Sequence, residues 1–307
     1  MQTRMEAYRE VTLASKDGYE LALRVYDTAK PKAVVKVIHG MEEHQGRYRA
    51  FAEYLQADGY AVVTADLRGH GETAPTLSHI AGRDGHLRLL EDEQVILDYI
   101  HERWPGVPVD LFAHSMGTII ARAFLQTQSR EYHRVVLSGY PNPNSAAGAG
   151  IMLTDVLSAF KGGSKKSGMV DNMVLGPFSK AFPEAKSPLE WLSRNPENVK
   201  RYAEDRLCGV PFTLGSYNAL FHLIKMMDTP SQYREVWKLL PILMISGKDD
   251  PCTGGEKGRT DSLNRLKEAG FREIRVETID GMRHEILNET ENRTVYRTIL
   301  DFLNEIA

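Results

Sequence analysis

Short apolar runs alternate with helix-period segments along most of this chain. The runs are rich in Val, Ile and Leu and have the length of buried strands. They occupy residues 19–26, 33–38, 60–66, 109–113, 134–139, 241–247 and 272–279. Because helical segments intervene from about residue 33 onward, the pattern predicts an α/β protein with a parallel sheet and helices on both faces. The first one or two strands, which no helix separates, are expected to form an antiparallel hairpin at the sheet edge.

Two of the intervening segments show a helical period clearly. Residues 47–58 place apolar side chains on one helical face, and residues 89–104 do the same. In a sheet of this kind, ligands and reactive groups gather outside the carboxyl ends of the strands. The loops that follow the strands are therefore the places to search for a site.

The alternation breaks between residues 140 and 238. Turn formers and small residues open this segment, a basic glycine-rich stretch lies at 161–168, and a helical pattern returns at 217–227. Because the insertion follows a strand, it is expected to lie over the ligand face. The sequence thus predicts a core formed by residues 1–139 and 239–307, with a mostly helical cap at 140–238.

Composition argues against several partners and locations. The net charge is −3, the pI is about 6.4, and no basic stripe with interleaved aromatic residues is present, which disfavours nucleic-acid binding. Cys208 and Cys252 lie far apart without metal-type spacing, so buried thiols in a reducing compartment are favoured. No signal-like block and no run of eighteen apolar residues is found. The expected location is cytoplasmic.

Ser115 stands where a strand turns directly into a helix, in "DLFAHSMGTIIARAFL" (residues 110–125). Such a junction strains the pivot residue and exposes its hydroxyl at the sheet edge, and it requires small neighbours two positions away. These neighbours are Ala113 and Gly117. The usual spelling is G-x-S-x-G, so Ala113 is a departure. On this pattern alone, a nucleophile and a serine that merely caps a buried helix remain equally good interpretations.

A nucleophilic serine requires a base and an acid, which in this fold follow it in the order acid, then histidine. His284 follows the last predicted strand, and Asp249 and Asp250 follow the strand before it. The spacing G-x-x-D favours Asp250 as the acid, with Asp249 facing solvent or the turn backbone. Asp280 and Glu285 are too close to His284 in sequence to orient it. A lone histidine in a loop is usually a surface residue, but this placement favours a base.

Two other strand ends carry notable residues. Gly40 permits a close turn after the strand at 33–38, so that the backbone N–H groups of Met41 and Met116 are candidate donors to an oxyanion, although "HG" alone is a weak signal. In "ADLRGHGET" (65–73), no histidine spacing of a metal site appears. Structural hydrogen bonds by Asp66 and Arg68 are therefore favoured over metal binding. A catalytic role for His70 is disfavoured.

Together, "HGMEEHQGRY", "GYAVVTADLRGHGET", "AHSMG", "ISGKDDPC" and "GMRHEILNE" resemble, in this order, the monoacylglycerol lipase and lysophospholipase-like α/β-hydrolases, whose shared domain is called the serine aminopeptidase type. The resemblance runs from about Tyr8 to Leu303. It implies the α/β-hydrolase fold, with an eight-stranded sheet and a helical cap, and no cofactor or metal. Its site residues would be Ser115, Asp250 and His284 as the catalytic triad, with Met41 and Met116 as oxyanion donors.

The function that follows is hydrolysis of lipid-like carboxylic esters, such as monoacylglycerols or lysophospholipids, through an acyl-enzyme. Two alternatives remain. An aminopeptidase on the same fold would need an anionic cluster for a substrate ammonium, whereas the acidic residues of the cap are scattered among lysines. A non-catalytic binding protein would be signalled by loss of a triad member, and all three are present.

Apolar side chains of the cap allow two interpretations. Most are expected to be core, and one or two could line an acyl pocket; they are Phe212, Leu214, Leu220, Phe221, Leu223, Met226 and Met227. Residues 150–160 are a candidate for transient contact with a membrane surface, although core packing is the favoured interpretation. The sequence does not indicate an oligomeric state.

Overall fold

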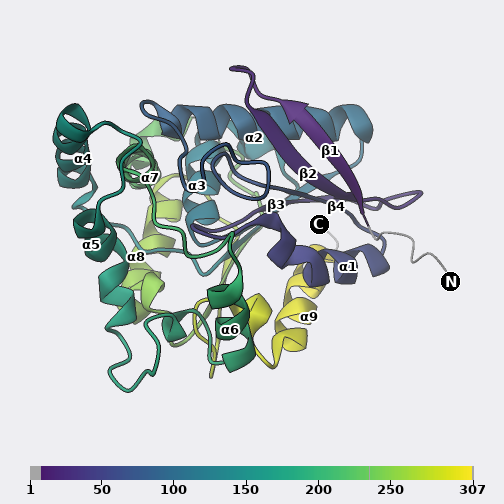
Figure 1. The fold of residues 1–307 in the computed structure, drawn as a ribbon. Coiled ribbons are helices and arrows are strands. Elements are labelled where there is room, and N and C mark those ends of the chain that lie inside the picture. The colour runs from purple at the N-terminus through teal and green to yellow at the C-terminus, as the bar shows by residue number, and fades with distance from the viewer. Residues whose placement is uncertain (1–7, 235, 306–307) are drawn as a thin grey trace, which may run out of the picture.

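The computed structural model describes residues 8–234 and 236–305. An eight-stranded sheet runs through it in the order β1-β2-β4-β3-β5-β6-β7-β8 (Figure 1). The strands are β1 Arg9–Ala14, β2 Glu20–Tyr26, β3 Val34–Ile38, β4 Ala61–Ala65, β5 Val109–His114, β6 Arg134–Ser138, β7 Ile242–Gly247 and β8 Ile274–Ile279. β2 pairs antiparallel with β1 and β4, and the other neighbours in the sheet are parallel. The predicted parallel sheet with an antiparallel edge is confirmed.

The central strands are buried on both faces, as their continuous apolar sequences require. Every residue of β3, β4, β5, β6 and β7 is buried. Lys36 interrupts the valines of β3 and is only 1% exposed. Its Nζ lies 2.6 Å from the carboxylate of Glu93 and donates to the Glu93 backbone carbonyl at 2.7 Å. A buried cation is tolerated only when it is paired in this way.

Helices cover the two faces of the sheet as separate layers (Figure 1). One layer contains α1 Arg49–Ala57 and α9 Asn292–Leu303, and the other contains α2 Gly85–Arg103, α3 Met116–Gln128 and α8 Gly255–Glu268. Each layer packs a hydrophobic cluster of its own against the sheet. The predicted helices at 47–58 and 89–104 correspond to α1 and α2, with ends that shift by a few residues.

The described residues between β6 and β7 include four α-helices: α4 Ala147–Lys161, α5 Gly168–Ser179, α6 Pro196–Glu204 and α7 Leu214–Met227. α7 packs into the same hydrophobic cluster as α2 and α3. Most of the apolar side chains expected to be core in this region are buried, namely Phe212, Leu214, Leu220, Phe221, Leu223 and Met227. α7 is thus part of the protein core, whereas α4 and α5 lie at the outer edge (Figure 1).

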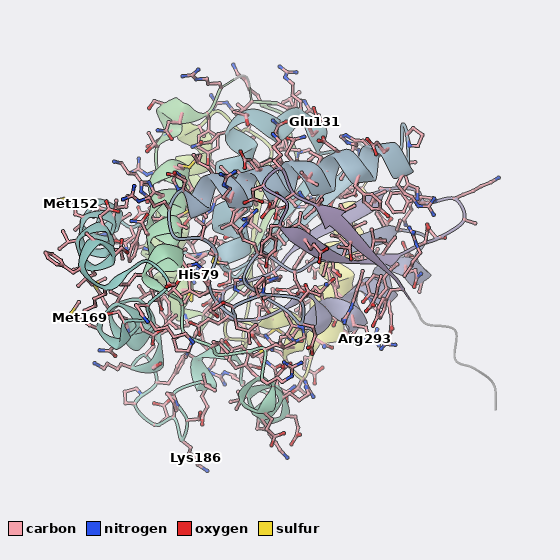
Figure 2. The ribbon with its side chains drawn as sticks, turned by 45° about the horizontal axis from the view of Figure 1, so that its top comes forward. His79, Glu131, Met152, Met169, Lys186 and Arg293 are labelled. Atoms are coloured by element: carbon pink, nitrogen blue, oxygen red, sulfur yellow. The ribbon has the colours of Figure 1, made fainter. Side chains whose placement is uncertain are left out.

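The outer face of α4 and α5 is apolar and exposed. Met152, Val156 and Phe160 of α4 are 71%, 55% and 86% exposed. Met169 and Met173 of α5 are 59% and 47% exposed, and Met152 and Met169 lie on the same side of the molecule (Figure 2). The favoured interpretation that residues 150–160 pack into the core is therefore wrong for this face. Among the helices of the described residues, none combines the length and the apolar composition that a bilayer span requires.

Candidate active site

Ser115 joins β5 to α3 in a conformation that few side chains adopt. Its backbone has φ 51° and ψ −121°, in a region where non-glycine residues are strained. The start of α3 passes so close to the end of β3 that a Cβ at Gly117 would lie 2.4 Å from the carbonyl oxygen of Ile38. Ala113 is fully buried inside β5. The local sequence thus forces the sharp turn, and the turn places the Ser115 hydroxyl at the carboxyl edge of the sheet.

Two loops from neighbouring strands complete a chain of contacts with this serine. Ser115 Oγ lies 2.9 Å from His284 Nε2, in the loop after β8. His284 Nδ1 lies 2.9 Å from Asp250 Oδ2, in the loop after β7. The Asp250 carboxylate also accepts a hydrogen bond from the Cys252 backbone N–H at 2.9 Å. The structure therefore brings together the three side chains that the sequence analysis selected, although they lie far apart in the chain.

The neighbouring aspartate points elsewhere. The Asp249 carboxylate lies 2.7 Å from Arg194 in a pair whose two side chains are 35% and 54% exposed. Asp250, by contrast, is 2% exposed. Of the two aspartates that the sequence left in competition, Asp250 is the one that faces His284.

His284 sits in a closed and mostly apolar environment. The Trp191 ring lies 5.0 Å from it and the His114 ring 4.7 Å. Burial lowers the pKa of His284, but the Asp250 carboxylate and then Cys252 raise it, and the net direction is upward. Burial and the neighbouring His284 hold the pKa of His114 down to about 4, so His114 is neutral at physiological pH.

The candidate oxyanion donors lie beside this serine. Neither the Met41 nor the Met116 backbone N–H donates a hydrogen bond to another residue within 8–234 or 236–305. A Cβ at Gly40 would lie 3.0 Å from Ser115 Cβ, so glycine is required there. Free amide donors next to a nucleophile can stabilise the negative charge that develops on a carbonyl oxygen.

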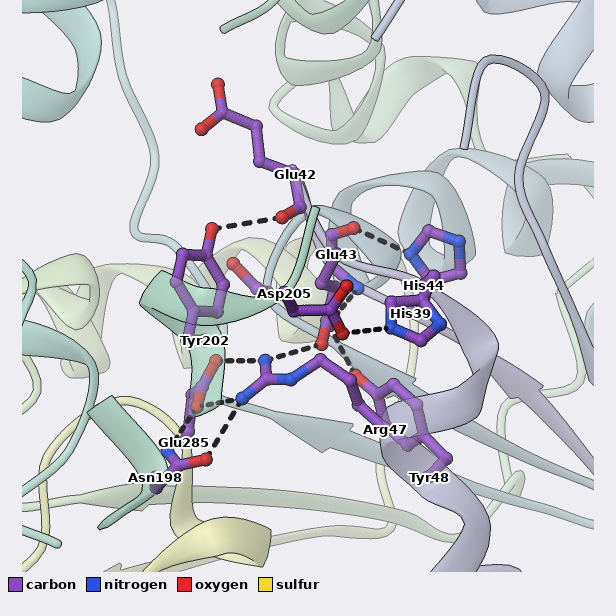
Figure 3. Close-up of polar contacts among 12 residues, drawn as sticks. His39, Glu42, Glu43, His44, Arg47, Tyr48, Asn198, Tyr202, Asp205 and Glu285 are labelled. Atoms are coloured by element: carbon purple, nitrogen blue, oxygen red, sulfur yellow. Dashed lines mark hydrogen bonds and ion pairs between the residues drawn. The ribbon is translucent and has the colours of Figure 1, made fainter. Parts of the chain in front are cut away.

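A buried network that the sequence analysis missed holds the loop after β3 that carries the candidate donor Met41, here called the oxyanion loop (residues 39–44) (Figure 3). Glu43 accepts hydrogen bonds from the Gly40 N–H at 2.6 Å and from Arg47 at 2.9 Å. Arg47 Nη2 in turn donates to Glu285 at 2.7 Å and to Asn198 at 3.1 Å. Burial opposes ionisation of Glu43, but Arg47 and two nearby histidines bring its pKa down to about 2. The Arg47 guanidinium thus links the oxyanion loop to the loop that carries His284 and to α6.

The residues of "ADLRGHGET" have structural contacts, as expected. Asp66 accepts hydrogen bonds from the backbone and side chain of Gln45, at 2.8 and 2.9 Å. Arg68 pairs with the buried Asp92 at 2.7 Å. Burial lowers the pKa of His70 to about 3, and its ring packs 5.1 Å from that of His39. These contacts stabilise the loop that follows β4.

Among the described residues, two clusters contain the side-chain types that bind metals. One is Asp250, Cys252 and His284, which overlaps the serine site, and the other is His44, Asp205 and Cys208. His44 Nε2 already lies 2.9 Å from Asp205. Burial raises the pKa of the Cys252 thiol to about 11 and that of Cys208 further. Metals bind the thiolate, so the donor chemistry favours neither cluster as a metal site. Both cysteines are free and buried, as predicted.

A cavity of about 490 Å³ opens onto Ser115 and His284. This volume suits a small-molecule ligand. Its walls are mostly apolar and come from α3, α4, α5 and α7, with Ile119, Leu153, Val174, Phe178, Leu220 and Phe221 among them. Leu220 and Phe221 are the residues of the predicted apolar set that reach it.

Several known proteins are similar to this chain in sequence and in architecture. A family model described as "Serine aminopeptidase, S33" matches residues 29–291. A monoacylglycerol lipase of Mycolicibacterium smegmatis is 27% identical over 91% of this chain and 92% of its own. The phospholipase YtpA of Bacillus subtilis is 23% identical over 90% and 96%. A solved structure of a thermostable carboxyl esterase from Bacillus coagulans, in complex with glycerol, superposes with a TM-score of 0.89 at 25% identity, over 97% and 98%.

Proposed function

Since this chain belongs to the serine aminopeptidase S33 family of α/β-hydrolases, we propose that it is a serine hydrolase acting through Ser115, His284 and Asp250. The chain is a carboxylic ester hydrolase, the class of the lipase and the esterase to which it is similar. The observation that carries the proposal is the unbroken chain of 2.9 Å contacts from the serine hydroxyl through the imidazole to the buried carboxylate. That arrangement is the one nucleophilic acyl transfer requires.

The reaction would proceed in two halves. His284 Nε2 accepts the Ser115 proton as Oγ attacks the ester carbonyl, and the backbone N–H groups of Met41 and Met116 stabilise the oxyanion. The imidazolium then gives its proton to the leaving alcohol, and the acyl-enzyme remains. A water molecule, activated by the same imidazole, releases the acid. Asp250 holds the imidazole in the tautomer that these transfers need.

We propose a lipid-like ester as the substrate, with monoacylglycerol or lysophospholipid as the nearest classes. The apolar walls of the cavity fit an alkyl chain better than a peptide. We also propose that residues 140–238 act as a cap, since α4 and α5 supply many of the residues that line the cavity at Ser115. The alternative of an aminopeptidase is less well supported, because the acidic Asp205 of the cap is paired with His44 rather than free for an ammonium.

A panel of substrates tests this proposal. Wild-type protein is expected to react with a fluorophosphonate probe and to hydrolyse monoacylglycerols and lysophospholipids. It is expected to leave aminoacyl arylamides uncleaved. Activity on p-nitrophenyl esters of graded length should show an optimum set by the cavity. Cleavage of the arylamides in preference to the esters would favour the peptidase, and a protein that the probe does not label would favour a binding protein.

The exposed apolar face of α4 and α5 leads us to propose transient contact with a membrane surface. Burying a large apolar side chain in lipid contributes about 1.5–3 kcal/mol. The double variant V156S/F160S is therefore expected to lower binding to phosphatidylcholine vesicles at least tenfold in a flotation assay. L87S/L239S, which removes two other exposed side chains, is the matched control and should bind as wild type does. Equal binding by both double variants would contradict the proposal.

A further inference from the structure

Glu42 lies in the oxyanion loop and is held in an unusual backbone conformation. Its φ is 55°, in the left-handed region that favours glycine. The Glu42 carbonyl oxygen accepts hydrogen bonds from the Gly209 N–H at 2.9 Å and from the Tyr202 hydroxyl at 3.0 Å. These contacts fix the backbone from outside the loop. The Glu42 side chain consequently extends away from the network that contains Glu43 (Figure 3).

One oxygen of the Glu42 carboxyl group, Oε1, lacks a hydrogen-bond partner among the described residues, while the Phe212 backbone amide hydrogen-bonds the carboxyl group. The residue lines the cavity and is 6% exposed, and its Oε1 is buried without a hydrogen bond. Within the described part of the chain, no other cavity-lining residue has such an unpartnered buried side-chain atom. Glu43 and Glu285 also line the cavity, but both are bound by Arg47. Because buried polar groups are nearly always hydrogen-bonded, an unpaired one at a binding cavity indicates a ligand group.

The surroundings of the Glu42 carboxyl group favour its protonated form. Burial, and then the charge of Asp171 on α5, raise its pKa to about 8, against the smaller opposite effects of the Phe212 backbone amide and Lys166. Asp171 accepts a hydrogen bond from Tyr217 of α7 at 2.6 Å. A protonated carboxyl group can both donate and accept a hydrogen bond. Below that pKa, Glu42 therefore suits a hydroxyl group and not a cation.

We propose that Glu42 determines leaving-group specificity: it hydrogen-bonds a free hydroxyl group of an uncharged alcohol and disfavours alcohols that carry a phosphate. The inference rests on the proposed function and narrows it to monoacylglycerols over lysophosphatidates. The rest of the cavity is largely apolar and suits the acyl chain, whereas glycerol brings hydroxyl groups next to the ester. A phosphate would lose its hydration in this cavity, where the described lining residues include Glu42 and neither lysine nor arginine.

Three substrates with one acyl chain separate the leaving groups: 1-oleoylglycerol, methyl oleate and 1-oleoyl-lysophosphatidate. Glu42→Leu is expected to lower kcat/KM for 1-oleoylglycerol about tenfold, the value of one hydrogen bond. It should change kcat/KM for methyl oleate by less than about twofold. Glu42→Gln keeps a donor and an acceptor and should stay within about threefold of wild type on both neutral esters.

A pH series provides a readout that a merely structural role would not move. The phosphate is already ionised above about pH 7, whereas Glu42 ionises as the pH rises through about 8. In wild type, the ratio of kcat/KM for lysophosphatidate to that for 1-oleoylglycerol should therefore fall severalfold between pH 7 and pH 9.5. In Glu42→Gln this ratio should stay constant.

The outcomes that overturn the inference are distinct from failure of the proposed function. Equal losses on 1-oleoylglycerol and methyl oleate in Glu42→Leu would assign Glu42 a structural role. If the ratio of kcat/KM for lysophosphatidate to that for 1-oleoylglycerol fell with pH in Glu42→Gln as it does in wild type, the charge of Glu42 would not be the cause of the fall. If wild type did cleave aminoacyl arylamides, and Glu42→Gln lost that activity while it kept ester hydrolysis, Glu42 would instead be an ammonium site. Wild type that neither reacts with fluorophosphonate nor hydrolyses methyl oleate would overturn the proposed function itself, and this inference with it.

Discussion

Replacing Ser115 with alanine is expected to lower kcat for ester hydrolysis by about 10⁶-fold. The substitution removes the only atom that the proposed mechanism joins to the acyl group, and His284 then has no hydroxyl within its 2.9 Å contact to activate. The residual rate should be that of water reacting in the oxyanion site. The measurement is kcat on a p-nitrophenyl ester with protein of known active-site concentration, together with fluorophosphonate labelling, which should vanish.

The control for this variant is another serine at a strand end of the same sheet. Ser138 closes β6, is fully buried, and has a hydroxyl without a hydrogen-bond partner among the described residues. Ser138→Ala should retain kcat within a few-fold and should unfold near the wild-type temperature. Ser115→Ala that keeps even one hundredth of wild-type turnover would show that another group attacks the ester.

The loops that carry the proposed triad could be located from the sequence because the fold confines them. Parallel strands direct their carboxyl ends to one edge, so the loops after β5, β7 and β8 had to meet there. The same reasoning separated Asp250 from Asp249, since two extra residues after Gly247 allow the chain to turn inward. The fold was predictable for this reason, and the family was predicted from the resemblance of five ordered motifs; the family match confirms both.

The Arg47 network could not be found in the same way. Glu43 and Arg47 have the i, i+4 spacing of an ordinary surface pair. Their other partners, Asn198 and Glu285, lie on distant segments, and sequence spacing gives no information about such contacts. The unpartnered Oε1 of Glu42 was hidden for a related reason, because the burial of an atom and its lack of a hydrogen bond are properties of the folded chain.

The outer face of α4 shows a different limit. The helix is apolar on most sides, "AGAGIMLTDVLSAFK", so its pattern did not distinguish the buried side from the exposed one. Only the position of the helix at the edge of the molecule separates Phe160, which is 86% exposed, from the buried Gly150 and Thr154. A strongly apolar segment predicted burial, and packing against α7 accounts for one face alone.

Asp250→Asn is expected to lower kcat by about 10⁴-fold while it preserves the shape of the site. The amide can still occupy the position 2.9 Å from His284 Nδ1, but it offers an N–H or a neutral oxygen and no negative charge. The imidazole is then held in the wrong tautomer, and the imidazolium of the transition state loses its counter-charge. Because the Asp250 carboxylate raises the pKa of His284, its loss should also move the acid limb of the residual kcat/KM profile to lower pH.

Asp249→Asn supplies the matched control for this variant, since it makes the same chemical change one residue away. Its carboxylate joins Arg194 in an exposed pair, and such pairs contribute about 0–1 kcal/mol to stability. Asp249→Asn should therefore keep kcat within about threefold and an unchanged acid limb, as measured on one p-nitrophenyl ester from pH 5 to pH 10. If the two variants lost activity equally, or if the loss fell on Asp249 instead, the buried carboxylate would not be the group that orients His284. The charge needed to stabilise the imidazolium would then come from a residue outside the 2.9 Å chain of contacts.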